Sequence, residues 1–174
     1  VYTPSVYGVG AIAYEDLWPA AGDFDFNDLV LNYKFISIAN ADDEVVEMIA
    51  RFSIKNIGGS LRNGFGFSMP VDKDLIESVT GTQVSGDIVS LDGKGLEQGQ
   101  EKTVIIVFED AFLSDGETIE VLIKFVEPTD PEKIGLPPFD PFIFIGGDRS
   151  RELHLGDMEP TDLGGSEFFG VDQD

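Results

Sequence analysis

The sequence predicts an all-β fold, an antiparallel β-sandwich or jelly-roll-like domain, and three observations support this class. Several segments alternate apolar and polar residues, the period of a strand with one buried face. Glycine, proline, asparagine and aspartate separate these segments at fairly regular intervals, as turns between strands require. Helical periodicity is almost absent. Since 174 residues suffice for one domain with a substantial core, we expect a single domain over residues 1–174.

Four strands are predicted in the first half of the chain, over residues 7–14, 29–39, 45–57 and 65–69. The second and third are joined by a short polar turn and form a hairpin. The third has an apolar face that is predicted to be buried, formed by Val46, Met48, Ala50, Phe52 and Ile54. After Pro70, residues 72–79 can form one or two helical turns with Asp72 as the N-cap.

The second half predicts further short strands, over residues 87–91, 102–108, 118–126, 142–145 and 152–155. The run 102–108 is largely apolar and suits a strand buried on both faces. Five prolines between residues 128 and 141 predict a loop or an extended edge in place of a regular strand. Residues 156–174 are acidic and glycine-rich, and we expect them to lie over the surface.

The chain is strongly acidic, with 33 Asp and Glu against 11 Lys and Arg and a formal net charge of −22. This charge argues against nucleic acid and anionic membrane surfaces as partners. The absence of cysteine excludes disulfides, thiolate metal sites and a cysteine nucleophile. We expect no transmembrane segment, because no apolar run approaches about 20 residues. The first residue is Val1, so we expect a processed or trimmed segment.

An acidic stretch lies between the first two predicted strands, with six oxygen-bearing side chains at Glu15, Asp16, Asp23, Asp25, Asn27 and Asp28. Alternation places Asp23, Asp25 and Asn27 on one side, and Asp28 breaks it, so a bend or bulge is expected there. Clustered carboxylates repel by roughly 4 kcal/mol per pair at an effective dielectric constant of about 20. Ca²⁺ would remove that repulsion and suits such oxygen ligands better than Mg²⁺.

We therefore predict a structural Ca²⁺ site that orders one end of the sandwich. The alternative is a solvated turn in which the Asp and Asn side chains bond their own backbone. An EF-hand does not fit, because counting from Asp23 places Asp28 where glycine is required and Lys34 where glutamate is required.

Other chemistry-bearing residues have simpler interpretations. His154 is the only histidine, and partial burial with a hydrogen bond to a carboxylate is favoured over catalysis, since no G-x-S-x-G motif is present. Residues 148–151 suit an exposed turn with ion pairs. Tyr14, Trp18 and Phe65 are either core residues or an aromatic platform for sugars. A carboxylate pair for glycoside hydrolysis is conceivable, but nothing in the sequence selects one.

Five segments, which span most of the chain, follow the pattern of a known family: residues 14–19, 22–30, 63–67, 152–155 and 160–162 with Phe169 and Gly170. In this E-D-L-W-P and D-x-D-x-N-D-L pattern the chain resembles the LruC-domain family of bacterial exported proteins. The resemblance implies a cell-surface (outer-membrane) or secreted module, often linked to lipoproteins, of poorly defined activity. Members of that family usually continue past the position of Asp174 with a Trp- and Pro-rich segment.

A similar pattern occurs in bacterial adhesin modules regarded as calcium-dependent, which implies the same six ligands by position. We therefore expect a non-enzymatic, extracytoplasmic, calcium-binding module for surface adhesion or protein interaction. Its expected partner is a surface protein or a glycan. A carbohydrate-binding module and a hydrolase with a carboxylate pair remain alternatives.

Overall fold

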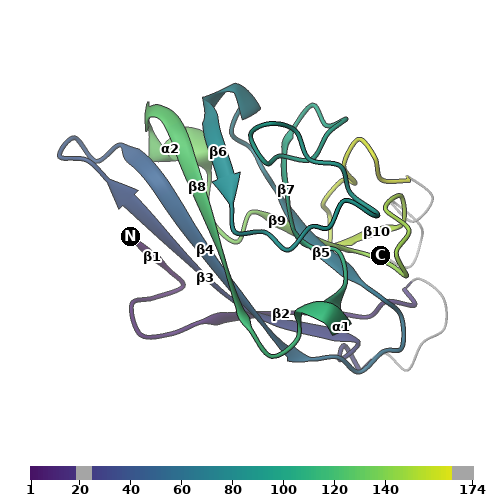
Figure 1. Cartoon of the computed structure of the whole chain (residues 1–174). Coiled ribbons are helices and arrows are strands. Elements are labelled where there is room, and N and C mark those ends of the chain that lie inside the picture. The colour runs from purple at the N-terminus through teal and green to yellow at the C-terminus, as the bar shows by residue number, and fades with distance from the viewer. Residues whose placement is uncertain (19–24, 166–174) are drawn as a thin grey trace.

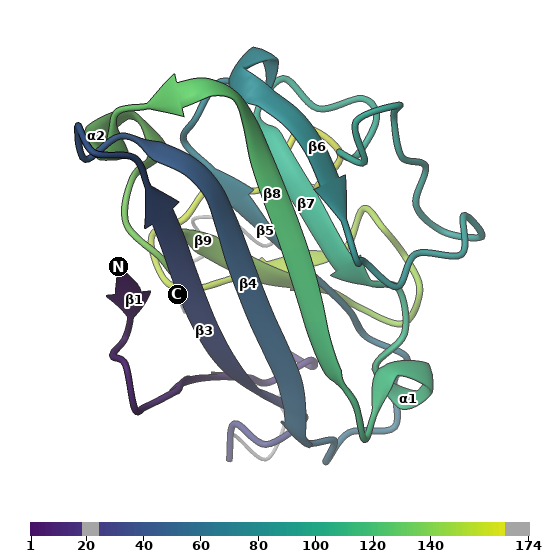
Figure 2. The ribbon, with the colours of Figure 1, turned by 60° about the vertical axis from the view of Figure 1, so that its left-hand side comes forward.

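The computed structural model describes residues 1–18 and 25–165, which form two antiparallel β-sheets packed face to face (Figure 1). The predicted all-β sandwich is therefore confirmed. The larger sheet has the order β1-β3-β4-β8-β6, and β2 also pairs with β3. The smaller sheet has the order β10-β9-β5-β7 and lies behind the larger one in Figure 2.

The strand bounds of the larger sheet are Tyr2–Thr3 (β1), Gly10–Tyr14 (β2), Leu29–Ala39 (β3), Val45–Asn56 (β4), Ile76–Thr80 (β6) and Thr118–Thr129 (β8). Those of the smaller sheet are Gly64–Met69 (β5), Thr103–Phe108 (β7), Asp140–Phe144 (β9) and Glu152–His154 (β10). Three short helical turns connect strands, at Lys73–Leu75 (η1), Ala111–Ser114 (α1) and Pro131–Ile134 (α2). Each begins after an aspartate whose side chain accepts a backbone N–H of the first turn, at Asp72, Asp110 and Asp130.

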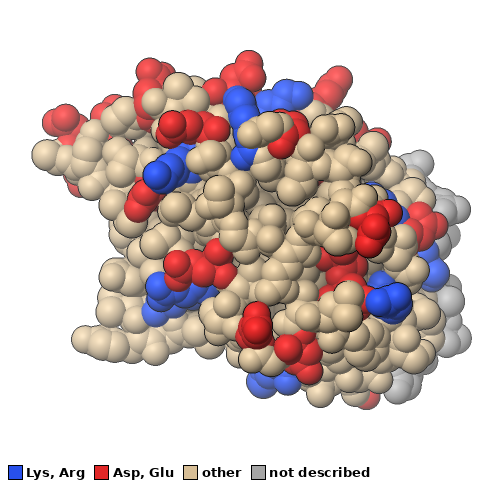
Figure 3. Space-filling view, viewed as in Figure 1, with Lys and Arg blue, Asp and Glu red and all other residues tan. Residues whose placement is uncertain are grey.

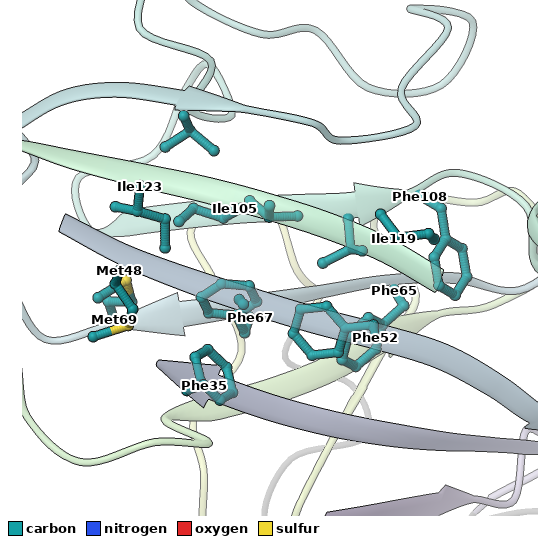
Figure 4. Packing of buried hydrophobic residues seen from close by; sticks show 14 of the residues in the cluster. Phe35, Met48, Phe52, Phe65, Phe67, Met69, Ile105, Phe108, Ile119 and Ile123 are labelled. Atoms are coloured by element: carbon teal, nitrogen blue, oxygen red, sulfur yellow. The ribbon is translucent and has the colours of Figure 1, made fainter. Parts of the chain in front are cut away.

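Phenylalanine rings pack together with aliphatic side chains in the space between the sheets (Figure 4). Phe35 meets the rings of Phe52 and Phe67 edge to face, with centroids 5.7 and 5.6 Å apart and an interplanar angle of 88° in both pairs. Such edge-to-face pairs add to the stabilisation from burial because the ring edge is positive and the ring face negative. The core thus fixes how the two sheets lie against each other.

The smaller sheet is buried on both faces. Its outer face is covered by the long connection between β6 and β7, where Val89 packs with Val104, Ile106, Phe142 and Phe144. This agrees with the prediction that the apolar run of β7 is buried on both sides. On the same outer face, a Cβ on Gly64 would lie 1.9 Å from the Phe144 ring, so glycine lets that ring lie flat on β5.

The middle of the connection between β6 and β7, over residues 85–89, is held by a carboxylate. Glu109 accepts the backbone N–H groups of Ser85, Ile88 and Val89 at 2.8, 3.1 and 2.8 Å. The strand predicted over 87–91 is therefore wrong, because these N–H groups bond to a side chain in place of a neighbouring strand. Within the described residues, Leu91 makes only an isolated bridge with Glu97.

Two other predictions fail where local irregularities decide the structure. Residues 72–79 form the single turn η1 capped by Asp72 and then the strand β6, so the helical prediction holds only for the first half. The strand β8 continues through Pro128, next to the bulge that shifts its pairing with β4 between Val45 and Glu47. The same bulge turns Val45 into the core in place of Val46.

On the face shown in Figure 3, acidic and basic residues lie interspersed among uncharged ones. Within residues 1–18 and 25–165, no helix has the length and apolar character needed to cross a membrane.

Candidate functional site

The first part of the acidic stretch follows the strand β2 and lies at one end of the sandwich. Directly after it, Glu15 and Asp16 are both buried. The backbone N–H of Asp16 donates to Oδ2 of Asp28 at 3.0 Å, which ties the start of the acidic stretch to its end. Asp28 immediately precedes β3, so the antiparallel pairing of β2 with β3 brings these residues together.

The carboxylates of Asp16 and Asp28 converge on the loop after β4. A Cβ built on Gly59 would lie 2.8 Å from Oδ2 of Asp16 and 2.9 Å from Oδ1 of Asp28. Both oxygens therefore lie within 3.0 Å of one point beside the Gly59 backbone, and glycine leaves room for them. Asn63, at the end of the same loop, donates from Nδ2 to Oδ2 of Asp16 at 2.7 Å and is itself buried.

The protonation of this pair reflects its surroundings. Burial raises the pKa of Asp16 above its usual range, against the hydrogen bond from Asn63, which lowers it. The neighbouring Asp28 carboxylate adds to the increase, and the positive charge of Arg151 makes the smallest contribution, in the opposite direction. A buried carboxylate whose pKa is raised, with a second carboxylate beside it, forms a site that a proton or a cation stabilises.

The six residues predicted as metal ligands do not all meet. Asp16 and Asp28 come together, and Glu15 is buried beside Asp16. Asp25 is exposed and accepts a hydrogen bond from the side-chain amide of Asn27. Asp23 lies outside the described residues. Over the described ranges, no three His, Asp or Glu side chains are grouped as a metal site, so the Ca²⁺ site remains a prediction.

A pocket opens on the other side of Tyr14 and Glu15, where the edges of the two sheets face each other. It is lined by β2 from the larger sheet and by β10 and the residues after it from the smaller sheet, and its volume is about 330 Å³. Tyr14 lies in its wall with a buried hydroxyl that has no hydrogen-bond partner among the described residues. Burial, with the charge of Asp140 as a second cause, raises the pKa of Tyr14.

Behind the pocket, a buried ion network holds β10. Arg149 donates from Nε and Nη2 to the two carboxylate oxygens of Glu97 at 2.5 and 2.6 Å, and from Nη1 to Glu152. Glu152 also accepts the backbone N–H of Thr161 at 2.7 Å. Burial opposes ionisation of Glu152, but hydrogen bonds from His154 and Thr161 and the charge of Arg149 lower its pKa to about 2.

His154 belongs to the same network. Its Nδ1 lies 2.8 Å from Asp140 and its Nε2 lies 3.0 Å from Glu152, while the ring stacks on Phe142 at a centroid distance of 4.8 Å. Burial alone would lower the pKa of His154, but its hydrogen bonds to the two carboxylates raise it. The prediction of a partly buried histidine bonded to a carboxylate is confirmed.

Two other sequence predictions need correction, for Arg149 and Asn63, and the alternatives left open for the aromatic residues are resolved. Arg149 is not part of an exposed turn, because its side chain is only 10% exposed and stands over the ring of Phe142. For the aromatic residues the core interpretation holds at Tyr14 and Phe65, which are buried, and Trp18 is half-buried, so the three do not form a sugar-binding platform. Asn63, read from sequence only as a turn residue before Gly64, is the amide partner of Asp16.

Comparison with known proteins gives a family. A family model described as a domain of unknown function (DUF4842) matches residues 43–174, about three quarters of the chain. The chain belongs to this family. The DUF4842 match begins in the turn before β4, so it includes Gly59, Asn63 and β10, whereas β2 and the acidic stretch precede it. No curated protein and no solved structure matches the chain.

Proposed function

We propose that this DUF4842 chain is a non-enzymatic, extracytoplasmic interaction module whose β-sandwich is stabilised by Ca²⁺ at the end where β2 meets β3. The observation that carries the proposal is the convergence of the buried Asp16 and Asp28 carboxylates beside Gly59. In this role the cation is structural, and the surface around it serves adhesion to a cell-surface protein or glycan.

The chemistry of the pair favours a cation over a simple turn. In a solvated turn the carboxylates would be exposed and would bond their own backbone, whereas Asp16 and Asp28 are both buried and share one location. Carboxylate oxygens are among the ligands that Ca²⁺ prefers, and the amide N–H that Asn63 donates to Asp16 holds one of the two carboxylates in place. Asp16, Asp28 and Glu15 would hold the ion, and Asp23, Asp25 and Asn27 lie close by in sequence.

The experiment is a thermal unfolding series in EDTA, in Ca²⁺ and in Mg²⁺. Extracellular Ca²⁺ modules often bind with Kd of about 10⁻⁴ to 10⁻³ M. At a concentration 100 times Kd the folded state gains about 2.7 kcal/mol, which raises Tm by roughly 5–11 °C for a domain of this size. Ca²⁺ is therefore expected to raise Tm well above its value in EDTA, and Mg²⁺ to raise it less.

A matched pair of variants separates a site from general charge screening. Asp28→Asn removes one converging carboxylate and is expected to abolish most of the Tm difference between Ca²⁺ and EDTA. Asp43→Asn removes the same charge from an exposed turn and is expected to leave that difference unchanged. The comparison within each variant cancels any change in its basal stability. Equal Ca²⁺ responses in the two variants, or no response in the unmodified protein, would refute the metal site.

The proposed location and role rest on additional features. A high acidic charge with no cysteine is compatible with work outside the cytoplasm, and the pattern around residues 14–30 resembles that of exported LruC-domain proteins. No feature of the described residues selects a nucleophile, because His154 is held between two carboxylates. We therefore favour binding over catalysis.

A further inference from the structure

We propose that the pocket between β2 and β10 binds a small organic cation, an ammonium group carried on an apolar body. This inference goes beyond the Ca²⁺ site and does not depend on it. It rests on the shape of the pocket, on the charge of its lining and on the aromatic residues at its opening.

The shape suits a small molecule. The volume of about 330 Å³ falls at the lower end of the range for small-ligand sites, roughly 300–1,000 Å³. Leu153, Leu155, Met158 and Pro160 give it an apolar wall on the side of the smaller sheet. Burying apolar ligand surface against such a wall contributes about 25 cal/mol per Å². A ligand with an apolar body therefore gains more here than a fully hydroxylated one.

The charge of the lining selects a positive head group. Glu15, Glu152 and Asp157 contribute three carboxylates, and the described lining contains no lysine or arginine. His154 is the one group of the described lining that can carry a positive charge, so carboxylates exceed cations even when it is protonated. Glu152 is already matched by Arg149 behind the wall, and the exposed Asp157 is the carboxylate that we expect to attract a ligand cation.

Aromatic residues stand at the opening. Trp18 and Phe26 line the pocket with Tyr14, and Phe26 is 53% exposed. The backbone of Phe26 has φ of 53°, a left-handed conformation that bulky residues rarely adopt. This conformation presents an exposed phenyl ring at the pocket. A cation over an aromatic face is attracted by the ring quadrupole, and the indole of tryptophan is the strongest such partner.

The test uses Trp18 as the reporter, because it is the only tryptophan in the chain. Its emission is titrated with 2-phenylethylammonium, with the neutral 2-phenylethanol, with the anionic 3-phenylpropionate and with methyl glucoside. We expect a saturable change with the ammonium compound, several-fold weaker binding of the alcohol and none of the carboxylate. Equal binding of the ammonium compound and the alcohol, or binding of the glucoside alone, would overturn the proposal. So would the absence of any saturable change.

Two variants locate the binding. Asp157→Asn removes a pocket charge at a residue with φ of 66°, a conformation that asparagine tolerates well. Loss of one partly exposed charge partner is expected to weaken ammonium binding about two- to fivefold. Asp43→Asn is the matched control, since Asp43 is also exposed and has φ of 62° but lies in the turn between β3 and β4.

A second substitution, Phe26→Leu, tests the aromatic contact and is expected to weaken the ammonium compound more than the alcohol. Thermal unfolding of each variant checks that it is folded at the titration temperature. Unchanged ammonium affinity in both Asp157→Asn and Phe26→Leu would place any binding elsewhere and refute the assignment of this pocket.

Discussion

Substitution of Arg149 by methionine tests whether the buried ion network holds the smaller sheet in place. The guanidinium bridges Glu97 and Glu152, and the three side chains are 10%, 2% and 0% exposed. It also stands 5.1 Å from the ring centroid of Phe142 and 5.5 Å from that of Phe144. One residue thus neutralises two buried carboxylates and covers two core rings.

Methionine keeps much of the apolar stem but leaves both glutamates without their main counter-charge. Removing one partner of a buried ion pair costs about 3–5 kcal/mol, because the remaining charge stays buried and uncompensated. For a domain of this size the corresponding fall in Tm is roughly 6–20 °C. The matched control is Arg51→Met, whose pair with Glu120 at 2.7 Å has side chains 44% and 52% exposed. Its expected cost is only about 0–1 kcal/mol.

Urea unfolding at neutral pH, followed by tryptophan emission and by far-UV circular dichroism, gives both free energies of unfolding. We expect Arg149→Met to be the more destabilised variant by at least about 2 kcal/mol. The difference in unfolding free energy between the two variants should narrow as the pH falls, because protons neutralise the buried Glu152 carboxylate, which has lost the charge of Arg149 in Arg149→Met. Equal costs for the two variants, or a gap independent of pH, would refute the reasoning.

Two further predictions follow from the geometry. Gly59→Ala would place a Cβ 2.8–2.9 Å from the two buried carboxylate oxygens and should destabilise the fold by about 1–3 kcal/mol. The control is Gly93→Ala, whose Cβ would have no atom within 4 Å and which should not destabilise the fold. Similar urea unfolding curves for the two variants would contradict this prediction. The two carboxylate partners of His154 raise its pKa in the folded state, against the effect of burial. Its stabilisation is therefore complete below the unfolded pKa of about 6.5 and is lost as the pH rises through the folded value. Urea unfolding from pH 5 to 9 should show this loss in the unmodified protein and not in His154→Gln, and a gain of stability in the same window would contradict it.

The strands that alternation predicted are those with one face on the core. The bounds of β3 are those expected, Leu29–Ala39, and in β8, where a strand was expected over 118–126, every second residue is buried, at Ile119, Val121, Ile123 and Phe125. A period of two is fixed by the pleat, so it is visible in the sequence wherever one face is buried. The strand β6 lacks such a pattern. The end of the helical turn at Leu75 and the start of a strand at Ile76 could therefore not be predicted from alternation.

The candidate site was only partly visible in the sequence, because its partners come from distant segments. Asp16 and Asp28 are close in sequence and were predicted together, but Gly59 and Asn63 reach them through the pairing of β3 with β4. The pattern around Arg149 is that of an exposed turn, and only the approach of the connection between β6 and β7 buries it against Glu97. The local sequence therefore predicts the turn, but it does not show that the connection between β6 and β7 excludes water from the side chain of Arg149.

The two walls of the pocket are held by separate means. β10 has three residues and, among the described strands, pairs only with β9, so backbone bonds alone fix it weakly. The side chain of Glu152 compensates by binding Arg149 and Thr161. On the opposite wall, five residue pairs align β2 with β3, and the bond from Asp16 to Asp28 fixes its end. Because each wall is anchored to its own sheet, the width of the pocket is set by the sandwich core. A ligand entering it would not have to order a strand, and this pre-organisation favours binding of even a small cation.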